Sequence, residues 1–401
     1  MTTTINNEHK KLNVPNLRFK EFQGEWEKCK LGTLAAKVGS GSTPKGGNAV
    51  YTSAGHCFVR SQNVGMGYLI LDDVAHINDG IHQKHKATEL KEDDVLLNIT
   101  GASIGRTAIA TKEIEGGNVN QHVCIIRANS KVSPKFLCNY IQTKKIQNYI
   151  QSLQTGGSRE GLNFEQIRSF PISLPNKAEQ NKIAQLLDKL NERIATQNKI
   201  IEDLKKLKSA IIEKVYKRIQ GTCYSYRQLF SIINERNKHL EYSNVLSASQ
   251  ERGMVSREDL NLDIHFERSN ISTYKIVKNG DYVIHLRSFQ GGFAFSEKTG
   301  ICSPAYTVLR PNNLLVYGYL SNYFTSRDFV KSLIIVTYGI RDGRSINVDE
   351  WLDMKVVIPS KEQQTHIVNV IESIENKIKN EETYSNCLLN QKQNLLRQMF
   401  I

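Results

Sequence analysis

The stretch that decides the fold runs from Leu174 to Leu190 and reads LPNKAEQNKIAQLLDKL. The same skeleton returns between Ile358 and Ile374 as IPSKEQQTHIVNVIESI. Five residues recur without a gap, each 184 positions further on (359 − 175 = 184): Pro175, Lys177, Gln180, Ile183 and Leu187 become Pro359, Lys361, Gln364, Ile367 and Ile371. One helix can begin like another by chance, so the flanking sequence decides whether a duplication is present.

The flanking sequence repeats as well. GLNFEQIRSFPISLP (161–175) lies over SINVDEWLDMKVVIP (345–359) at the same interval, and it matches Asn163 to Asn347. Further upstream, VNQHVCIIR ending at Arg127 parallels CSPAYTVLR ending at Arg310. The sequence is therefore a tandem duplication, and this sets the domain count before any local pattern is considered.

Length and composition agree with two substantial domains. The 401 residues suggest two or three domains, and the net charge of +13 favours a polyanionic partner such as nucleic acid or an acidic membrane surface. A merely basic, soluble protein remains the alternative on charge alone. The seven cysteines form no Cys-x-x-Cys pair, which fits a reducing compartment. Without a secretion signal or an apolar run of ~20 residues, we expect a cytoplasmic protein that enters no membrane.

The two recurring stretches open long helices with an apolar seam. The seam residues follow heptad spacing: Ile183, Leu187, Leu190 and Ile194 in the first helix, and Ile367, Ile371, Ile374 and Ile378 in the second. Polar residues interrupt both seams at equivalent places, at Gln197 and Glu381 and again at Lys208 and Lys392. Because shared interruptions can fix register between partners, the sequence predicts an antiparallel two-helix coiled coil with pseudo-two-fold symmetry. Two independent helices, each packed on its own domain, are the alternative.

The remaining sequence predicts two strand-rich domains of the α/β (α+β) class. We expect an N-terminal segment over 1–24, domain 1 over 25–177, a spacer helix over 178–220, domain 2 over 221–360 and a second spacer helix over 361–401. Strands are predicted at 93–100, 122–127, 280–287 and 306–310, and single helices at 134–153 and 317–334. The spacer helices, at about 35 residues or roughly 50 Å, are far longer than an average globular helix.

Polar loops rich in Gly, Ser, Asn, Gln and Arg separate these elements. Such side chains reach phosphates and base edges, although they are also ordinary turn residues. A recurring Gly-x-Arg-acidic-Gly pattern predicts phosphate contacts for Arg159 and Arg341. The residues predicted to read bases are Arg60, Gln62 and Asn63 in the first domain and Gln250, Arg252 and Arg287 in the second. Arg106 and Arg344 complete the predicted DNA-binding set.

Two motifs suggest other chemistry and are weaker, and a third motif is absent. GASIG (101–105) matches a nucleophile elbow around Ser103, but the alternating residues after it predict a strand rather than the required helix. His82 and His85 have a ligand spacing without a second ligand pair, so we expect surface histidines and no metal site. The sequence also lacks the Asn/Asp-Pro-Pro-aromatic motif of adenine methyltransferases, which argues against methylation by this chain itself.

The order of strand-rich domain, helix, second domain and second helix resembles the specificity subunit of type I restriction-modification systems. The likeness extends from LRFKEFQGEWEKCKLGTL (17–34) over nearly the whole sequence. Besides the two helix starts, its most specific pieces are TGGSREGLNFEQI (155–167) and DDVLLNITGASIGRTAI (93–109). The second domain departs from the first by carrying GGFAFSEKTG (291–300) in place of GASIGRTAIA (101–110), which leaves residue-by-residue transfer between the domains open.

This resemblance implies a non-catalytic subunit in which each domain reads one half of a split, asymmetric site on double-stranded DNA. Two methyltransferase subunits would bind the chain and methylate an adenine in each half, and restriction endonuclease subunits would join for cleavage. The chain itself would hold no cofactor, since S-adenosylmethionine belongs to the methyltransferase subunits and ATP and magnesium to the restriction subunits. A coiled-coil adaptor that binds no DNA, and a hydrolase using Ser103, remain as alternative hypotheses.

Overall fold

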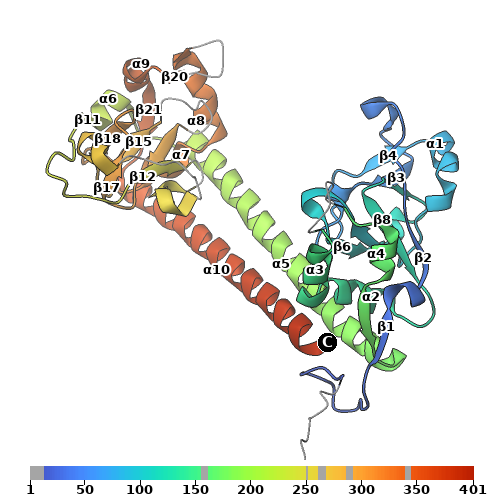
Figure 1. The fold of residues 1–401 in the computed structure, drawn as a ribbon. Coiled ribbons are helices and arrows are strands. Elements are labelled where there is room, and N and C mark those ends of the chain that lie inside the picture. The colour runs from blue at the N-terminus through green and yellow to red at the C-terminus, as the bar shows by residue number, and fades with distance from the viewer. Residues whose placement is uncertain (1–12, 155–160, 250–251, 261–267, 286–291, 339–344) are drawn as a thin grey trace, which may run out of the picture. The chain divides into compact units, whose positions relative to one another are not determined.

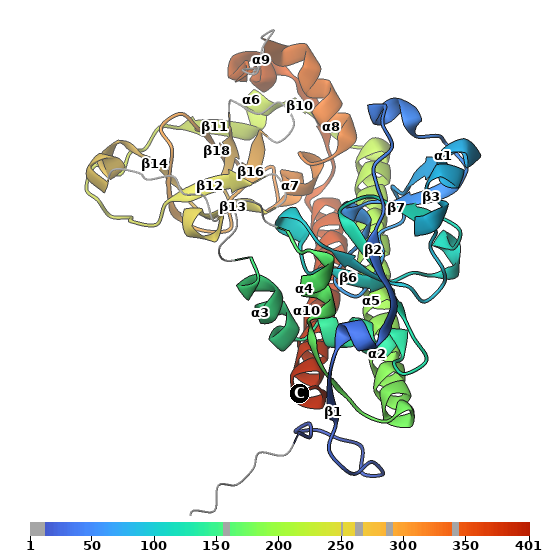
Figure 2. The same cartoon turned by 45° about the vertical axis from the view of Figure 1, so that its right-hand side comes forward.

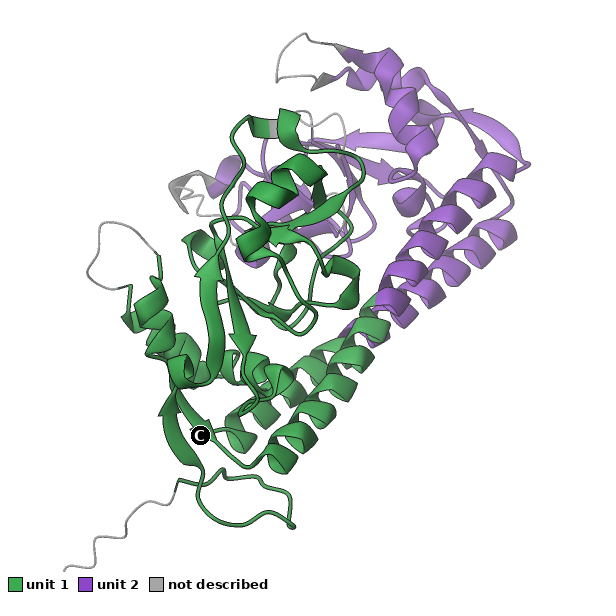
Figure 3. Cartoon of the chain, turned by 90° about the vertical axis from the view of Figure 1, so that its right-hand side faces the viewer, with its two compact units in different colours: residues 1–198, 383–401 green, residues 199–382 purple. Residues whose placement is uncertain are grey.

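The computed structural model describes residues 13–154, 161–249, 252–260, 268–285, 292–338 and 345–401. The chain divides into two compact units, and the division falls inside both long helices (Figure 3). Unit 1 comprises residues 1–198 and 383–401, and unit 2 comprises residues 199–382. None of the described helices combines the length and the apolar character that crossing a bilayer requires.

Unit 1 is built on a four-stranded antiparallel sheet in the order β2-β8-β5-β6 (Figure 1). Its strands are β2 (Ala35–Ser40), β8 (Val123–Ala128), β5 (Val95–Asn98) and β6 (Thr107–Ile109). A smaller sheet joins β4 (Ala75–Ile77), β3 (His56–Val59) and β7 (Asn118–Val119), and β1 (Glu27–Lys30) pairs with β9 (Pro171–Leu174). The helices are α1 (Asp79–Lys84), α2 (Pro134–Ile141), α3 (Lys144–Ser152), α4 (Phe164–Arg168) and the start of α5 (Lys177–Arg218).

Unit 2 repeats this plan with the strand order β11-β18-β15-β16. These strands are β11 (Phe230–Ile233), β18 (Thr307–Pro311), β15 (Tyr282–Ile284) and β16 (Phe293–Phe295). The other pairs are β12 (Leu246–Ser249) with β13 (Gly253–Ser256), β14 (Lys275–Val277) with β17 (Gly300–Cys302), β10 (Thr222–Ser225) with β21 (Lys355–Ile358), and β19 (Thr337–Tyr338) with β20 (Ser345–Ile346). The helices are the second part of α5, α6 (Tyr226–Leu229), α7 (Tyr319–Tyr323), α8 (Arg327–Ser332), α9 (Val348–Asp353) and the first part of α10 (Lys361–Met399), whose end belongs to unit 1.

Helix and sheet are therefore mixed in both units, as the sequence predicted, and the four predicted strands form the centre of the two main sheets. The predicted helices at 134–153 and 317–334 are each divided, so the expectation of single helices was wrong. Thr143 accepts a hydrogen bond from the backbone N–H of Ile146 and begins α3, and Ser326 accepts one from Phe329 and begins α8. A hydroxyl at the first position starts a new helix by satisfying a free N–H group.

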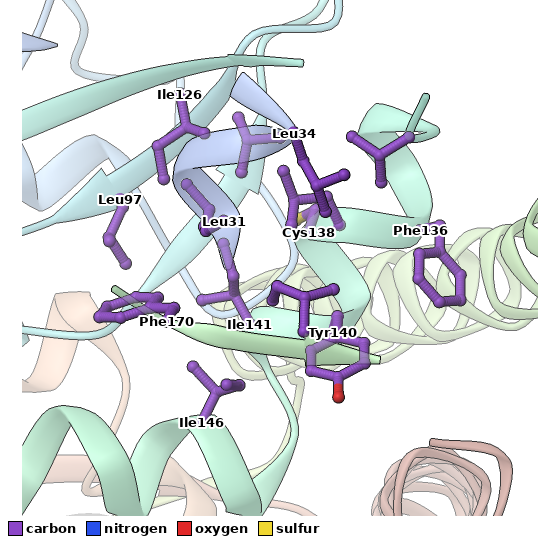
Figure 4. Close-up of a cluster of buried hydrophobic side chains, with 14 of the residues drawn as sticks. Leu31, Leu34, Leu97, Ile126, Phe136, Cys138, Tyr140, Ile141, Ile146 and Phe170 are labelled. Carbon is purple, nitrogen blue, oxygen red and sulfur yellow. The ribbon is translucent and has the colours of Figure 1, made fainter. Parts of the chain in front are cut away.

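The core of unit 1 lies between the main sheet and the helices α2 and α3 (Figure 4). Leu97 and Ile126 face it from the sheet, while Phe136 and Tyr140 face it from α2, and all four side chains are fully buried. The same cluster includes Ile183 and Leu187 from α5, Leu396 and Met399 from α10, and Phe400 directly after α10. The ends of the two long helices are thus part of the domain core rather than a separate spacer.

Two buried glutamines explain why the helix start recurs. In unit 1, Gln180 accepts a hydrogen bond from the N–H of Ser133 and donates to the carbonyl of Pro175, both at 2.8 Å. In unit 2, Gln364 accepts from the N–H of Val316 at 2.8 Å and donates to the carbonyl of Pro359 at 3.0 Å. Each amide therefore ties the first turn of a long helix to its own domain. Each proline follows directly after the last strand of its domain.

Within each unit, α5 and α10 lie side by side and run in opposite directions (Figures 1 and 2). In unit 1, the hydroxyl of Ser385 donates to Asn198 at 3.0 Å. In unit 2, Lys208 pairs with Glu375 at 2.5 Å and Lys205 with Glu382 at 2.7 Å. The predicted seam residues divide by burial: Ile183, Leu187, Leu190, Ile371 and Ile378 are buried, and Ile194, Ile367 and Ile374 are partly buried.

The described part of the N-terminal segment packs on both long helices of unit 1. Arg18 makes a two-pronged ion pair with the buried Glu179 of α5, at 2.7 and 2.8 Å. The backbone N–H of Leu17 donates to the carbonyl of Gln398 in α10 at 2.9 Å. Lys182 forms an ion pair with Glu21 on the same face of α5. The segment therefore fixes the first turns of α5 and the last turns of α10.

Candidate nucleic-acid interface

Several polar loops of unit 1 meet at one end of the main sheet. The side chain of Asn98, at the end of β5, donates to the carbonyl of Ser61 at 2.8 Å and holds the loop that follows β3. The N–H of Gly67 in the same loop donates to the carbonyl of Thr107 at 2.7 Å. The 99–106 loop in turn pairs through Thr100 with Gly161. Three loops in which the sequence predicted DNA contacts are thus joined by hydrogen bonds.

The glycine-rich stretch over 38–47, which was predicted as a loop, begins in the last residues of β2 and joins the same surface. The N–H of Thr43 donates to the side chain of Gln121 at 2.9 Å, and His122 next to it bonds the hydroxyl of Thr100 at 2.6 Å. Gly41 lies so close to Val119 that a Cβ at this position would be 1.7 Å from the Val119 carbonyl oxygen. Only glycine permits this approach, and the exposed Lys45 lies in the same stretch.

Arg106 is the predicted DNA-binding residue most freely presented on this surface. It is exposed and directly precedes β6, at the end of the loop that begins with Gly101. Among the described residues, its guanidinium makes no ion pair with an acidic side chain. An arginine without a carboxylate partner is available to a phosphate or to a guanine edge.

Arg60 and Gln62 are held together by an aspartate that the sequence had not singled out. Arg60 Nη2 donates to the backbone carbonyl of Asp73 at 3.1 Å, and the guanidinium lies 5.7 Å from the centre of the Tyr51 ring. Gln62 Nε2 donates to Asp73 Oδ2 at 3.2 Å. Because Gln62 and Asp73 are exposed whereas Arg60 is only partly so, Gln62 is the better placed of the predicted pair to reach a base.

Asn63 shapes the loop rather than facing outward. Its side chain is only 1% exposed, accepts a hydrogen bond from the N–H of Arg60 at 2.9 Å and donates to the carbonyl of Ile70 at 2.9 Å. Both ends of the amide are used within the loop, so the prediction that Asn63 reads a base was wrong. Its polar character alone could not reveal this, since a buried asparagine and an exposed one look alike in sequence.

In unit 2, Arg252 is the predicted site residue that can be placed. It is exposed and follows the β12 strand, and its backbone N–H donates to the hydroxyl of Ser249 at 3.4 Å. The next residue, Gly253, has a φ of +67°, and a Cβ there would lie 2.5 Å from the carbonyl oxygen of Phe295. This packs the β12–β13 hairpin against β16.

Five further predicted residues lie outside the described residues: Arg159, Gln250, Arg287, Arg341 and Arg344.

The weaker motifs have structural roles. Ser103 ends a short 3-10 helix (Gly101–Ser103) that leads into β6 and not into a helix, as the sequence predicted, so no nucleophile elbow forms. His82 is 2% exposed, stacks on His56 with ring centres 3.7 Å apart and bonds Asn118 at 2.8 Å. The prediction of a surface histidine was therefore wrong for His82. Within the described ranges, no cluster of His, Cys, Asp and Glu could hold a metal ion.

In each unit, an ion pair with a buried carboxylate and a partly exposed arginine joins a strand of the main sheet to the residue before the neighbouring strand. Arg127 of β8 binds both oxygens of Asp94 at 2.7 Å, and Arg310 of β18 binds both oxygens of Asp281 at 2.9 Å. The aspartates are 1% and 2% exposed, and their hydrogen bonds raise the pKa of both arginines. The two units therefore share this polar contact as well as the strand order of their main sheets.

Comparisons with known proteins agree with this architecture. Residues 23–206 match the family model of the type I restriction modification DNA specificity domain. The putative type I restriction enzyme MjaX specificity subunit of Methanocaldococcus jannaschii is 22% identical over 52% of this chain and 49% of its own length. The type I restriction enzyme EcoBI specificity subunit of Escherichia coli is 26% identical over 33% of this chain and 28% of its own length. The chain therefore matches half or less of each of these relatives.

Two solved structures share the fold over nearly the full length. A chain solved to describe complex assembly and conformational transition of the type I R-M system has a TM-score of 0.57 at 15% identity, covering 94% of this chain and 97% of that one. The S subunit of the type I restriction-modification system from M. genitalium has a TM-score of 0.56 at 14% identity, covering 97% and 99%. The family resemblance seen in the sequence is thus confirmed. Residues 23–206 carry the type I restriction modification DNA specificity domain, and the chain is similar to specificity subunits of type I restriction-modification systems.

Proposed function

We propose that this chain is the DNA-recognition subunit of a type I restriction-modification complex and performs no catalysis itself. The observation that carries the proposal is the convergence of the 38–47, 60–70 and 99–106 loops and Gly161 at one end of the main sheet of unit 1. Loops fixed on a rigid sheet can hold polar side chains at defined distances from base edges. The net charge of +13 favours association with a phosphate backbone.

The same plan in unit 2 supports two recognition domains that read two half-sites. Because the loop sequences of the two units differ, the half-sites should differ too, which makes the site asymmetric. We further propose that α5 and α10 form one continuous antiparallel coiled coil that separates the domains with pseudo-two-fold symmetry. The 42 residues of α5 would extend about 60 Å, more than the roughly 34 Å of one DNA turn.

The remaining parts of the reaction would belong to partners in the cytoplasm. Two methyltransferase subunits, which hold S-adenosylmethionine, would methylate one adenine in each half-site. Methylation inside a duplex requires the adenine to be turned out of the stack, so the recognition domains would grip the flanking bases during this step. Restriction endonuclease subunits, with ATP and magnesium, would add cleavage.

The salt dependence of DNA binding tests the proposal. The complex reconstituted with its methyltransferase subunits should bind duplex carrying its recognition site, and the logarithm of the affinity should fall linearly with the logarithm of the salt concentration. Arg106→Ala should weaken binding and, if Arg106 contacts a phosphate, reduce the salt slope by about 1. Arg193→Ala on the exposed face of α5 serves as the matched control and should leave both unchanged.

One outcome would count against this assignment, and a second only against the role of Arg106. A reconstituted complex that binds no duplex at any salt concentration would favour a coiled-coil adaptor that holds proteins together without DNA. A salt-dependent complex in which Arg106→Ala and Arg193→Ala behave alike would leave DNA binding in place but remove Arg106 from the interface.

A further inference from the structure

One turn of the candidate interface carries exposed apolar side chains. Met66, Tyr68 and Ile70 are 38%, 60% and 38% exposed, although large apolar side chains are usually covered. The turn is tight, since Val64 pairs with Leu69 and the N–H of Gly65 donates to the carbonyl of Tyr68 at 2.9 Å. Clustered exposed apolar groups on an ordered turn indicate a binding surface.

The Tyr68 ring is held in place by the glycine beneath it. A Cβ at Gly65 would lie 2.7 Å from both Cε2 and Cζ of the ring, so one side of the ring rests directly on the Gly65 backbone. The rest of the side chain remains 60% exposed. Tyr68 is therefore a flat aromatic surface whose orientation is fixed before any ligand binds, and this reduces the entropy that binding would cost.

The base of the turn is fixed from below. Gly67 has a φ of +90° and donates its N–H to the carbonyl of Thr107 at 2.7 Å. A Cβ at Gly67 would lie 2.7 Å from Gln142 Oε1 and 2.8 Å from Lys392 Nζ. Lys392, which the sequence marked as an interruption of the α10 seam, is only 8% exposed, and burial lowers its pKa. The turn is thus supported by β6, by the end of α2 and by α10.

The surroundings of the turn favour DNA as the occupant. Thr107, which anchors the turn, directly follows the exposed Arg106, and the exposed Gln62 lies in the same loop as Tyr68. An aromatic side chain on a turn that also carries a glutamine, and that is anchored next to an arginine, suits the edge of a duplex, where a base face and a phosphate lie close together. A protein partner would more often be met by a wider apolar patch without such polar neighbours.

We propose that Tyr68 stacks on a base next to the adenine that is turned out of the duplex in the half-site of recognition domain 1. The proposal rests on the DNA-recognition function and adds to it one residue and one role. Turning out an adenine leaves its neighbours with an exposed face, and apolar or aromatic side chains stabilise such unstacked steps. Tyr68 lies on a fixed turn, so it can cover that face without rearrangement.

The test uses the full chain in complex with its methyltransferase subunits and duplexes that carry its methylation motif, once that motif is mapped. 2-Aminopurine is placed beside the target adenine in one half-site or the other. Tyr68→Ala should weaken binding by about 5- to 100-fold, the range expected for one base stacked on an aromatic ring, and should change the fluorescence in one half-site only. Tyr68→Phe should stay within about twofold of the parent chain, because the ring is kept.

Two further variants separate stacking from general disruption. Gly65→Ala should displace the ring and resemble Tyr68→Ala, whereas Ile335→Ser, at a residue 77% exposed in unit 2, should bind as the parent does. Unchanged affinity and fluorescence in Tyr68→Ala would overturn the proposal, and so would a defect confined to assembly with the methyltransferase subunits. If the parent complex binds no duplex, the proposed DNA-recognition function is wrong. If the parent complex binds duplex and Tyr68→Ala binds it equally well, only the stacking role of Tyr68 is wrong.

Discussion

Gln180, in the recurring helix start, offers a quantitative test of how each long helix is tied to its domain. Its side chain is 1% exposed and binds three backbone groups: the N–H of Ser133 at 2.8 Å, the carbonyl of Pro175 at 2.8 Å and the carbonyl of Lys131 at 3.2 Å. Gln180→Leu keeps a similar size but leaves one buried donor and two acceptors without a partner.

The expected cost follows from these three groups. A buried backbone group without a hydrogen bond costs ~1–3 kcal/mol, and the added apolar surface of leucine returns part of the loss. We therefore expect Gln180→Leu to lower the free energy of unfolding of unit 1 by about 3 kcal/mol. Gln185→Leu is the matched control. It makes the same substitution at an exposed residue of the same helix and should stay within about 0.5 kcal/mol of the parent.

The assay uses the two tryptophans of the chain, because one is buried in each unit. Trp26 belongs to the core of unit 1 and Trp351 to that of unit 2. In the full chain with Trp351→Phe, the fluorescence of Trp26 reports urea unfolding of unit 1 alone. With a urea dependence of ~1–3 kcal/mol per molar, Gln180→Leu should lower the midpoint by about 1–3 M. Equal urea midpoints for Gln180→Leu and Gln185→Leu would refute the proposal that the Gln180 side chain holds α5 on its domain.

Two further predictions concern buried groups of unit 1. Arg127→Ala should destabilise unit 1 by about 3–5 kcal/mol in the same assay, because it leaves the Asp94 carboxylate buried without its partner, and Asp94→Asn in that background should restore part of the loss. Burial raises the pKa of Cys124 to about 12 from an ordinary value of 9.0, so a thiol reagent at pH 8 should label the exposed Cys223 rapidly and Cys124 only after unfolding. Between these pKa values the unfolded thiol loses its proton while the folded one keeps it. The free energy of unfolding should therefore fall as the pH rises above 9, and urea unfolding at pH 8 and pH 10 would measure this fall. Rapid labelling of Cys124 in the folded chain would contradict its burial.

The sequence predicted what depends on periodicity. The heptad spacing and the recurring proline predicted the long helices at 178–220 and 361–401, within two residues of the observed ends of α5 (Lys177–Arg218) and α10 (Lys361–Met399). A strand end, a proline and a capping residue follow one another before both helices. The central strands were recovered for the same reason, since buried strands are short apolar runs between polar turns.

Burial of individual polar residues could not be predicted in this way. Asn63 and His82 are polar residues whose partners, Ile70 and Asn118, approach them only in the folded chain. The breaks before α3 and α8 did have a local signal, since Thr143 and Ser326 are good helix-capping residues. The apolar periodicity across each break outweighed that signal. Tyr68 was missed because an exposed aromatic residue looks like a core residue until its neighbours are known.

The most direct test of the central claim is a genome-wide map of methylated adenines in cells with and without this chain, with the methyltransferase and restriction subunits left in place. Because each recognition domain would read a different half-site, removal of the chain should abolish methylation at one split, asymmetric motif and leave other methylation unchanged. Exchanging the loops of unit 1 for those of another specificity subunit should alter one half of that motif alone. An identical methylation pattern with and without the chain would contradict the assignment.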